Sequence, residues 1–539
     1  MADAGHRTSP VVAAAAGLAI YLGLLGILLW LSLGRTGGEF TYAQDDPYIH
    51  LAMARTLAEH GVWGVRAGEF ASASSSPLWT LLLAGLWALG AHQVWVPFAL
   101  NVVLGMAVVV LAARYGAELS PRAGLVVAAI VLVTPLPTLA FIGMEHTLQV
   151  LLVLVFAWQA CERLAGDRDD WLRPSMTAAV MAATRYESLF LVAVVGAVLL
   201  WRGRVRPAAV LAAASAAPLA AFAAYSVAHG GLILPNSVLM KSGPGRFESF
   251  SAGVAAVAAD WIAVRNLFLR PPQLALTLAA LGGLLLVPAA ALRGARVWLV
   301  ALFVATSVLH ACLVKLEWFF RYEAYLMVLG VLALAGLAAA VEWPRGVERK
   351  RRAPWHPATI PLLVLLGMPL AVRALTALAT TSGATGNIFE QQVQLGRFFR
   401  QHYPGRPIAV NDLGAVAWLS TSPILDIVGL ASQPVADLKR RRSLDAAALG
   451  RLADERHVEA IALYEDVFAP ILPASWVKVG EWKIQNNVGV SGDVVAFFAR
   501  TDLDAAVLER ALQAYAASLP EGVGWRATRQ RVLPVSAGS

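Results

Sequence analysis

Charged residues are scarce in this sequence, and their scarcity excludes an ordinary soluble domain. Only 14% of the 539 residues are charged, whereas 58% are hydrophobic, and the mean hydropathy is +0.63. Soluble domains carry about 25% charged residues. The composition therefore predicts a polytopic α-helical membrane protein, in which each span needs about 20 apolar residues.

Cysteine is also scarce, and several functional motifs are missing. The two cysteines, Cys161 and Cys312, fall within or beside apolar runs and form no motif, so no disulfide framework is implied. No Gly-rich nucleotide-binding loop is present. His50 and His146 lack the spaced partners of a metal site, so the sequence does not indicate a divalent metal. The net charge of +8 comes from arginines in short loops between apolar runs, which argues against nucleic acid as a partner.

The apolar runs and the basic loops together predict a topology in a lipid bilayer. The first run, 11–33, is too long for the core of a signal peptide and predicts a retained anchor. Under the positive-inside rule, the N-terminus and the basic loops lie in the cytoplasm, and the loops between them lie outside. We expect roughly eleven spans, two of them short arms that meet at Arg185, in a bacterial inner membrane. The basic loops are at 114–122, 163–173, 202–206, 293–296 and 345–352.

A change of composition near residue 380 divides the chain into two domains. Residues 1–379 are expected to form the transmembrane domain, with outer loops at 34–94 and 228–271. Residues 380–520 alternate strand-like and helix-like runs, which predicts a periplasmic α/β domain, and residues 521–539 are expected to be a disordered tail. The expected strands are 408–411, 424–428, 460–464, 477–484 and 494–499, and the expected helices are 388–402, 413–419, 444–456 and 504–517.

Two adjacent carboxylates, Asp45 and Asp46, follow the first apolar run. Charges at a membrane boundary are costly to keep, which favours a functional role. Because Pro47 suits the start of a helix, Asp46 is predicted to be the N-cap of an interfacial helix over about 47–60, followed by an interfacial or re-entrant segment over 78–91. One carboxylate is enough for a cap, so Asp45 is left for a chemical role.

Further charged residues fall on the expected outer face. Within the interfacial helix, Arg55 and Glu59 have the spacing of an i,i+4 ion pair. Arg185 and Glu187 interrupt an otherwise apolar hairpin, where charges need partners. They either pair only with each other or face a cavity shared with other segments. Arg321 either serves the site or anchors the end of a span beside interfacial aromatics.

Two aspartates of the expected α/β domain have a simpler interpretation. Asp412 and Asp426 each end or interrupt a strand-like run. Structural roles at turns or helix starts are favoured for both, although either could also face the cavity or a glycan.

An ordered set of motifs resembles a known superfamily. The motifs are Asp45-Asp46-Pro47-Tyr48-Ile49 with Arg55, Ser75-Ser76-Pro77-Leu78-Trp79, Gly143-Met144-Glu145, Thr184-Arg185-Tyr186-Glu187, Leu234-Pro235-Asn236-Ser237 with Lys241, Val410-Asn411-Asp412 and Leu425-Asp426. Together they resemble the GT-C glycosyltransferases. Within these, the sequence is most similar to the mycobacterial terminal β-(1→2)-arabinofuranosyltransferase group.

The resemblance implies a reaction and assigns roles to residues. It implies inverting transfer of a sugar, arabinofuranose in that group, from a polyprenyl-phosphate donor to a cell-envelope glycan acceptor on the outer face. Asp45 would be the general base and Asp46 would orient base or acceptor. The expected cations around the donor phosphate are Arg185, Lys241 and Arg321. The expected acceptor- or substrate-binding residues are Glu145, Glu187, His50, Arg55 and Asn236.

Two alternative functions remain open from the sequence. A transporter or flippase for a lipid-linked glycan would also need many spans and buried charges, but the sequence has no internal repeat of the kind that transporters often show. A GT-C protein O-mannosyltransferase would differ chiefly in its acceptor.

Overall fold

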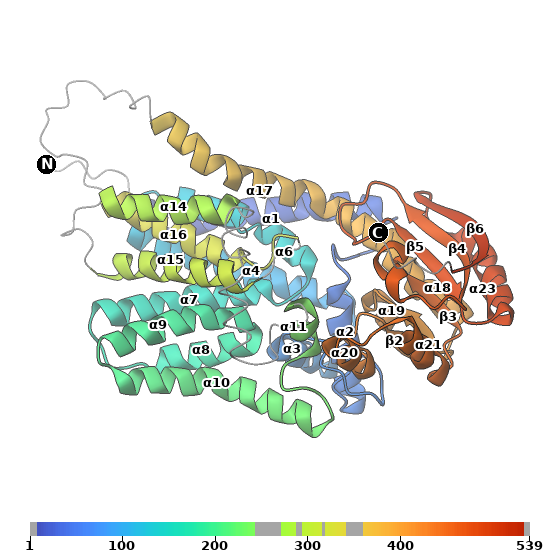
Figure 1. The fold of residues 1–539 in the computed structure, drawn as a ribbon. Coiled ribbons are helices and arrows are strands. Elements are labelled where there is room, and N and C mark those ends of the chain that lie inside the picture. The colour runs from blue at the N-terminus through green and yellow to red at the C-terminus, as the bar shows by residue number, and fades with distance from the viewer. Residues whose placement is uncertain (1–7, 243–270, 287–293, 315–318, 341–358, 533–539) are drawn as a thin grey trace, which may run out of the picture.

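The structure is a computed structural model that describes residues 8–242, 271–286, 294–314, 319–340 and 359–532. It consists of a helical domain and a C-terminal α/β domain, with α2, α3, α11 and α20 between them (Figure 1). The basic loop at 345–352, Arg293 and most of the outer loop 228–271 lie outside the described residues.

The helices of the first domain follow the expected apolar runs. They are α1 (Pro10–Arg35), α2 (Asp46–His60), α3 (Pro77–Ala88), α4 (Val96–Leu119), α5 (Ala123–Val133), α6 (Leu136–Ile142), α7 (His146–Ala165), α8 (Leu172–Thr184), η1 (Tyr186–Ser188), α9 (Leu189–Trp201), α10 (Val205–Ala228), α11 (Asn236–Ser242), α14 (Pro271–Leu286), α15 (Ala295–Leu313), α16 (Ala324–Ala340) and α17 (Thr359–Ile388).

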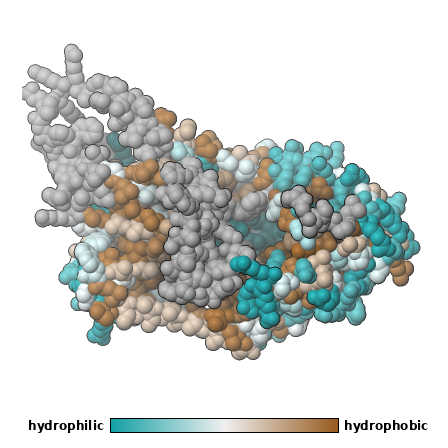
Figure 2. Space-filling model, in the orientation of Figure 1, coloured by the Kyte–Doolittle hydropathy of each residue, from teal (hydrophilic) through white to brown (hydrophobic). Residues whose placement is uncertain are grey.

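The helical domain is that of a multi-pass membrane protein. Among the described residues, six helices are long and apolar enough to cross a bilayer, and α3, α9 and α16 are shorter apolar helices. Large apolar side chains such as Trp30 and Leu125 are exposed on this domain. Hydrophobic residues cover much of its visible surface, whereas hydrophilic residues gather over the α/β domain (Figure 2). The count of roughly eleven spans stays a prediction.

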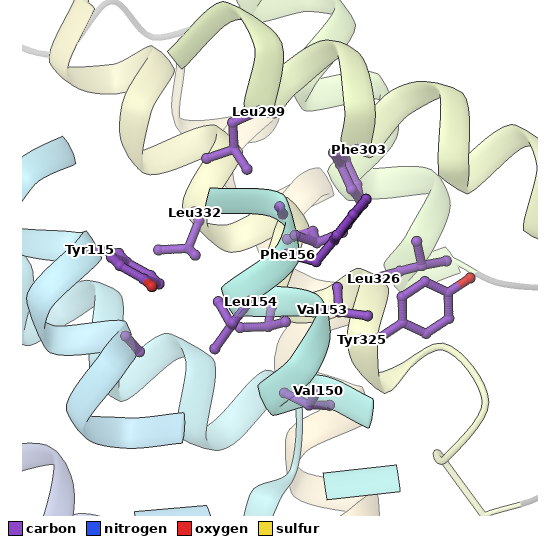
Figure 3. Packing of buried hydrophobic residues seen from close by; sticks show 14 of the residues in the cluster. Tyr115, Val150, Val153, Leu154, Phe156, Leu299, Phe303, Tyr325, Leu326 and Leu332 are labelled. Atoms are coloured by element: carbon purple, nitrogen blue, oxygen red, sulfur yellow. The ribbon is translucent and has the colours of Figure 1, made fainter. Parts of the chain in front are cut away.

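The core of the helical domain is built around α7. Figure 3 shows its Val153 and Phe156 among side chains of α15 and α16, such as Phe303 and Leu332. On another side, Trp158 of α7 stacks on Tyr115 of α4 with ring centroids 4.1 Å apart. This packing fixes α7, so that its N-terminus is held at the end of the bundle that faces the α/β domain (Figure 1).

The α/β domain contains one mixed sheet of six strands in the order β2-β1-β3-β5-β4-β6. Strands β2, β1 and β3 are parallel, and β5, β4 and β6 are antiparallel to their neighbours. The strands are β1 (Ile408–Val410), β2 (Ile424–Asp426), β3 (Ala460–Leu463), β4 (Val477–Ile484), β5 (Val494–Ala499) and β6 (Val523–Arg531). The helical elements are η2 (Phe389–Val393), α18 (Gln394–His402), α19 (Gly414–Leu419), α20 (Gln433–Arg440), α21 (Ala446–Glu455), α22 (Glu465–Phe468), η3 (Ala469–Ile471), α23 (Asp502–Tyr515) and η4 (Ala516–Ser518).

Alternating side chains of the strands feed two apolar cores, as the two-residue period of a strand requires. Ala409, Ile461 and Phe498 face a core that includes residues of α20 and α21. Their neighbours Ile408 and Phe497 face a second core with residues of α18, α19 and α23. That second core also contains Ile49 and other residues of α2, so it continues into the helical domain.

The helix α2 is largely buried between the two domains because it packs on both of them, and its place at the membrane interface stays a prediction. Two other sequence predictions about these elements are wrong. Residues Val523–Arg531 are not a disordered tail: they form β6 and pair with β4. Arg55 donates to the carbonyls of Ala417 and Trp418 instead of bonding Glu59, whose carboxylate accepts a hydrogen bond from Trp87.

Candidate functional site

Several of the predicted site residues lie at helix ends, where the helical bundle faces the α/β domain (Figure 1). Asp46 begins α2, Glu145 directly precedes α7, Arg185 lies between α8 and η1, and Arg321 lies shortly before α16. The break between α8 and α9 at Arg185 confirms the predicted meeting of two short arms. Helix ends leave backbone groups unpaired, which makes such junctions natural places for polar side chains.

The turn before α7 needs its glycine. Gly143 ends α6 with φ +65°, and a Cβ there would lie 2.3 Å from the Tyr42 ring. An L-residue is disfavoured at this φ, and a side chain would displace the tyrosine. Gly143 therefore lets the chain turn tightly between α6 and α7, so that Glu145 lies directly before α7, where its buried carboxylate meets Arg185.

Arg185 is buried and binds two carboxylates. Its Nη1 lies 2.8 Å from Oε1 of Glu145, and its Nε lies 3.0 Å from Oε2 of Glu187 while Nη2 contacts the other oxygen at 2.5 Å. Both interpretations left open by the sequence are thus partly right. Arg185 does pair with its neighbour Glu187, and it also reaches a carboxylate from α7, which shows that distant segments share this site.

Arg321 provides a second buried cation. Its Nη2 lies 2.8 Å from Oδ2 of Asp46, and its Nη1 contacts the sulfur of Met144. The Nε of Arg321 is buried and has no hydrogen-bond acceptor among the described residues. The guanidinium groups of Arg321 and Arg185 both lie against the Tyr322 ring, 5.2 and 5.3 Å from its centroid. The aromatic ring favours this placement of cations.

His50 joins α2 to the same cluster. Its Nε2 lies 3.7 Å from Oε2 of Glu145, and its Nδ1 lies 3.3 Å from Oγ of Ser74. His146 is also buried, with its ring 6.0 Å from that of Tyr322. No group of three or more His, Cys, Asp or Glu side chains among the described residues is arranged to hold a metal ion.

The structure contradicts the helix-cap argument by which the sequence distinguished Asp45 from Asp46. Asp46 is not the N-cap of α2: the helix already includes it, and its carboxylate binds Arg321. Asp45 occupies the N-cap position without a capping bond to its own helix. Its two oxygens instead accept hydrogen bonds from the backbone N–H groups of Gly414 and Ala415, at 2.6 and 2.8 Å. The argument that only Asp45 lacked a structural partner is therefore wrong.

Asp412 of the α/β domain lies in the same acidic environment. Its Oδ2 is 2.6 Å from the hydroxyl of Tyr464 and 2.8 Å from Nε2 of Gln392. Burial raises the pKa of Asp412, and the nearby Asp46 carboxyl adds to the rise. Burial also raises the pKa of Asp45, to about 8, with a further contribution from Asp412, although the two N–H bonds oppose it. Asp426, by contrast, binds the N–H groups of Val428 and Ala431 in a turn, which confirms its structural role.

Three predicted site residues lie elsewhere or are not described. Arg55 holds α19 of the α/β domain through two carbonyls. Asn236 begins α11 and donates to Leu430 and Gln433, so it also links the two domains. The side chain of Lys241 lies outside the described residues.

The sequence analysis assigned no role to Tyr322 and favoured a structural role for Asp412, although both lie at the candidate site. Tyr322 follows Arg321 directly, in a run that was interpreted as interfacial aromatics, beside which Arg321 either anchors the end of a span or serves the site. Its contact with two guanidinium groups depends on the packing of α7, η1 and α16, which no local pattern reveals. Asp412 was read as a local cap for the same reason, because its acidic neighbours are more than 360 residues away in the chain.

Comparison with known proteins gives distant likenesses. Residues 386–499 match a family model described as a domain of unknown function (DUF8728), which falls within the α/β domain. No curated protein matches the sequence.

Several solved structures are similar to the chain. ArnT from Cupriavidus metallidurans bound to undecaprenyl phosphate shares 12% identity over 90% of this chain and 98% of its own, with a TM-score of 0.49. Its apo form shares 14% identity over 92% and 99%, with a TM-score of 0.46. A mutant of the arabinofuranosyltransferase AftD from mycobacteria shares 16% identity over 89% of this chain and 41% of its own, with a TM-score of 0.42. At these identities and TM-scores the likenesses assign no activity to this chain.

Proposed function

We propose that this protein is an integral membrane glycosyltransferase. It moves a sugar from a polyprenyl-phosphate donor to a glycan acceptor at the outer face of the membrane in which it lies. The observation that carries the proposal is a cluster at one end of the helical bundle, in which buried Arg321 binds Asp46, the neighbour of Asp45. Buried Arg185 lies against the same Tyr322 ring as Arg321. A base and a phosphate-binding site are the two parts that this reaction needs. The sequence resemblance to arabinofuranosyltransferases favours arabinofuranose as the sugar.

The position of the site suits a lipid-linked donor. A polyprenyl tail can remain in the bilayer beside the helical domain while the sugar phosphate reaches the bundle end. There Arg321 offers its buried Nε–H group to a phosphate oxygen. Arg185 adds a second positive charge, because its guanidinium lies against the same Tyr322 ring as that of Arg321. Charge-assisted hydrogen bonds of this kind are strong in a site that excludes water. They stabilise the negative charge that develops on the phosphate as it leaves.

The reaction is a direct displacement at the anomeric carbon. The acceptor hydroxyl forms the new carbon–oxygen bond, its proton passes to an Asp45 oxygen, and the bond to the polyprenyl phosphate breaks with its electrons leaving on the phosphate. One displacement inverts the anomeric centre. Each Asp45 oxygen accepts one N–H bond and keeps a second lone pair. A base with a pKa near the working pH is effective, and burial raises the pKa of Asp45 to about 8.

The remaining charged residues position these groups. Arg321 holds Asp46 beside the base, where Asp46 orients the acceptor. Glu145 and Glu187 fix the guanidinium of Arg185, and His50 is placed to contact the acceptor or Glu145.

The test uses the purified full-length protein in nanodiscs with a polyprenyl-phosphate sugar and an oligosaccharide acceptor, with product detected by mass spectrometry. Wild-type protein is expected to extend the acceptor, and Asp45→Asn to lose about 100-fold or more of the rate. The exposed carboxylate of Asp493 provides the control, because Asp493→Asn lies outside the site. Full turnover by Asp45→Asn together with an inactive Asp46→Asn would move the base to Asp46. Translocation of labelled lipid without any glycosylated product would contradict the proposal and favour a transporter.

A further inference from the structure

The segment that carries the carboxylate pair is bound at both ends to one short helix of the other domain. Asp45 accepts hydrogen bonds from the N–H groups of Gly414 and Ala415, where α19 begins. Ten residues later, Arg55 donates to the carbonyls of Ala417 and Trp418, where α19 ends, at 3.1 Å each. Its guanidinium also lies 4.9 Å from the centroid of the Trp418 ring.

A third residue of the same loop strengthens this attachment. Arg66 donates to the carbonyl of Ala417 at 2.6 Å, to the carbonyl of Ser422 at 2.9 Å and to Oγ of Ser420 at 3.0 Å. Each of these bonds joins residues more than 350 positions apart in sequence. Bonds to charged groups contribute more than neutral ones, and these are partly shielded from water.

The contact at Gly414 leaves no room for a side chain. A Cβ on Gly414 would lie 2.1 Å from the backbone oxygen of Asp45 and 2.7 Å from its carboxyl carbon. Both distances are impossible, so any other residue at position 414 must displace Asp45 or α19. Glycine is therefore needed here for close approach and not for an unusual backbone angle.

From these contacts we infer that α19 is a positioning element of the reaction site, with Gly414 as the residue that sets the place of the Asp45 carboxylate. The inference rests on the proposed function, in which Asp45 is the base. The α/β domain is then more than an attached module, because the loop that carries the carboxylate pair is held against it. Misplacing a catalytic group by about 1 Å can lower a rate about 100-fold.

The first measurement does not depend on activity. Amide hydrogen exchange of residues 412–419 in the full-length protein is expected to speed up about tenfold in Asp45→Ala, because the N–H groups of Gly414 and Ala415 lose their acceptors. Asp45→Asn, which keeps one acceptor oxygen, is expected to give a smaller increase. Exchange of β4 should stay unchanged and thereby show that the domain remains folded. Equal exchange of residues 412–419 in all three proteins would overturn the inference.

The second measurement compares two glycine variants in the transfer assay. Gly414→Ala is expected to lower kcat about 100-fold with little change in the KM of the donor. It should also move the midpoint of the pH–rate profile upward, because the N–H bonds that lower the pKa of Asp45 are weakened. Gly450→Ala is the matched control, since a Cβ there meets only Pro473 at an ordinary 3.4 Å.

The two measurements separate the possible failures. A Gly414→Ala enzyme with the kcat and pH midpoint of wild type would overturn the inference and leave the proposed function standing. A wild-type protein that transfers no sugar would overturn the proposed function, while hydrogen exchange would still decide whether α19 holds Asp45.

Discussion

Arg373 and Arg185 are both buried arginines of the helical domain, but their surroundings differ. All three nitrogens of Arg373 donate: Nε to the carbonyl of Val133, Nη1 to Glu323 at 2.6 Å and Nη2 to the carbonyl of Phe320. Among the described residues, it thus meets one carboxylate and two backbone groups. Arg185 meets two carboxylates and lies beside a second cation, Arg321, whose Nε has no acceptor among the described residues.

This difference in partners distinguishes the structural ion pair of Arg373 and Glu323 from the proposed site around Arg185. Arg373 binds Glu323 and two backbone carbonyls, so this pair joins helices and loops. Around Arg185, described residues from α2, η1 and the segments just before α7 and α16 bring together charges of both signs. Buried charges are costly, and a cluster of them from several segments favours a functional site.

Removing Arg373 should have the largest effect on stability. Arg373→Leu takes the guanidinium away from the buried carboxylate of Glu323, and breaking such a pair costs about 3–5 kcal/mol in the free energy of unfolding. Denaturant unfolding of the protein in detergent micelles would measure this loss. The double variant Arg373→Leu/Glu323→Leu should recover part of it. A single variant as stable as wild type would show that this pair is not structural.

Matched lysine variants test whether the two arginines really differ in kind. Arg185→Lys keeps the charge but cannot bind Glu187 through two nitrogens while reaching Glu145. Transfer is therefore expected to fall about 100-fold. Arg373→Lys should lower the unfolding free energy but keep the turnover of each folded molecule. The two rates are to be compared per folded protein, and equal losses of turnover would remove the distinction.

The raised pKa of Asp45 predicts two pH effects. Transfer should increase as the pH rises toward about 8, because Asp45 must lose its proton to act as the base. Stability should change in the opposite direction. The folded-state pKa lies above the ordinary value of 3.8 for an aspartate, so the native state binds the proton more tightly and loses this stabilisation as the pH rises through about 8.

Rate and unfolding profiles from pH 5 to 9 check both effects. Unfolding of Asp45→Asn provides the reference, because asparagine does not titrate. A rate that does not vary with pH, or a wild-type protein that gains stability relative to this variant as the pH rises, would contradict the assignment.

The smallest effect is expected at an ion pair on the rim of the domain interface. Nη1 of Arg456 lies 2.9 Å from Glu69, but the side chains are 28% and 52% exposed. Such pairs contribute about 0–1 kcal/mol, since water already solvates both charges. Glu69→Gln should therefore change neither the unfolding midpoint in denaturant nor the transfer rate measurably. A clear loss of rate would extend the functional interface to this edge.

The α/β domain was predicted better than the site. The five expected strands lie within a few residues of β1 to β5, because short apolar runs between turn residues carry a strong local signal. The strand β6 was missed, since its sequence, with exposed arginines and few apolar residues, is stabilised by pairing with β4 and not by its own pattern.

For the candidate site, the sequence predicted which charged residues take part but not which residues they contact. The break at Arg185 could be read from charges in an apolar hairpin. The role of Asp46 could not, because a helix start beside Pro47 explains an aspartate locally, whereas its actual partner Arg321 is 275 residues later in the chain. Arg55 likewise had a local partner in sequence and a distant one in the structure.

The sequence by itself determined that this is a polytopic membrane protein, that an α/β domain follows near residue 380, and which charged residues stand at helix ends. These features depend on composition and short-range periodicity, which the chain carries locally. Only the tertiary structure decided which charges meet. Burial makes each buried charge depend on partners, and those partners come from whichever segments packing brings near. The Asp45 carboxylate is held by the backbone of Gly414 and Ala415, which present no side chain that a sequence pattern could mark.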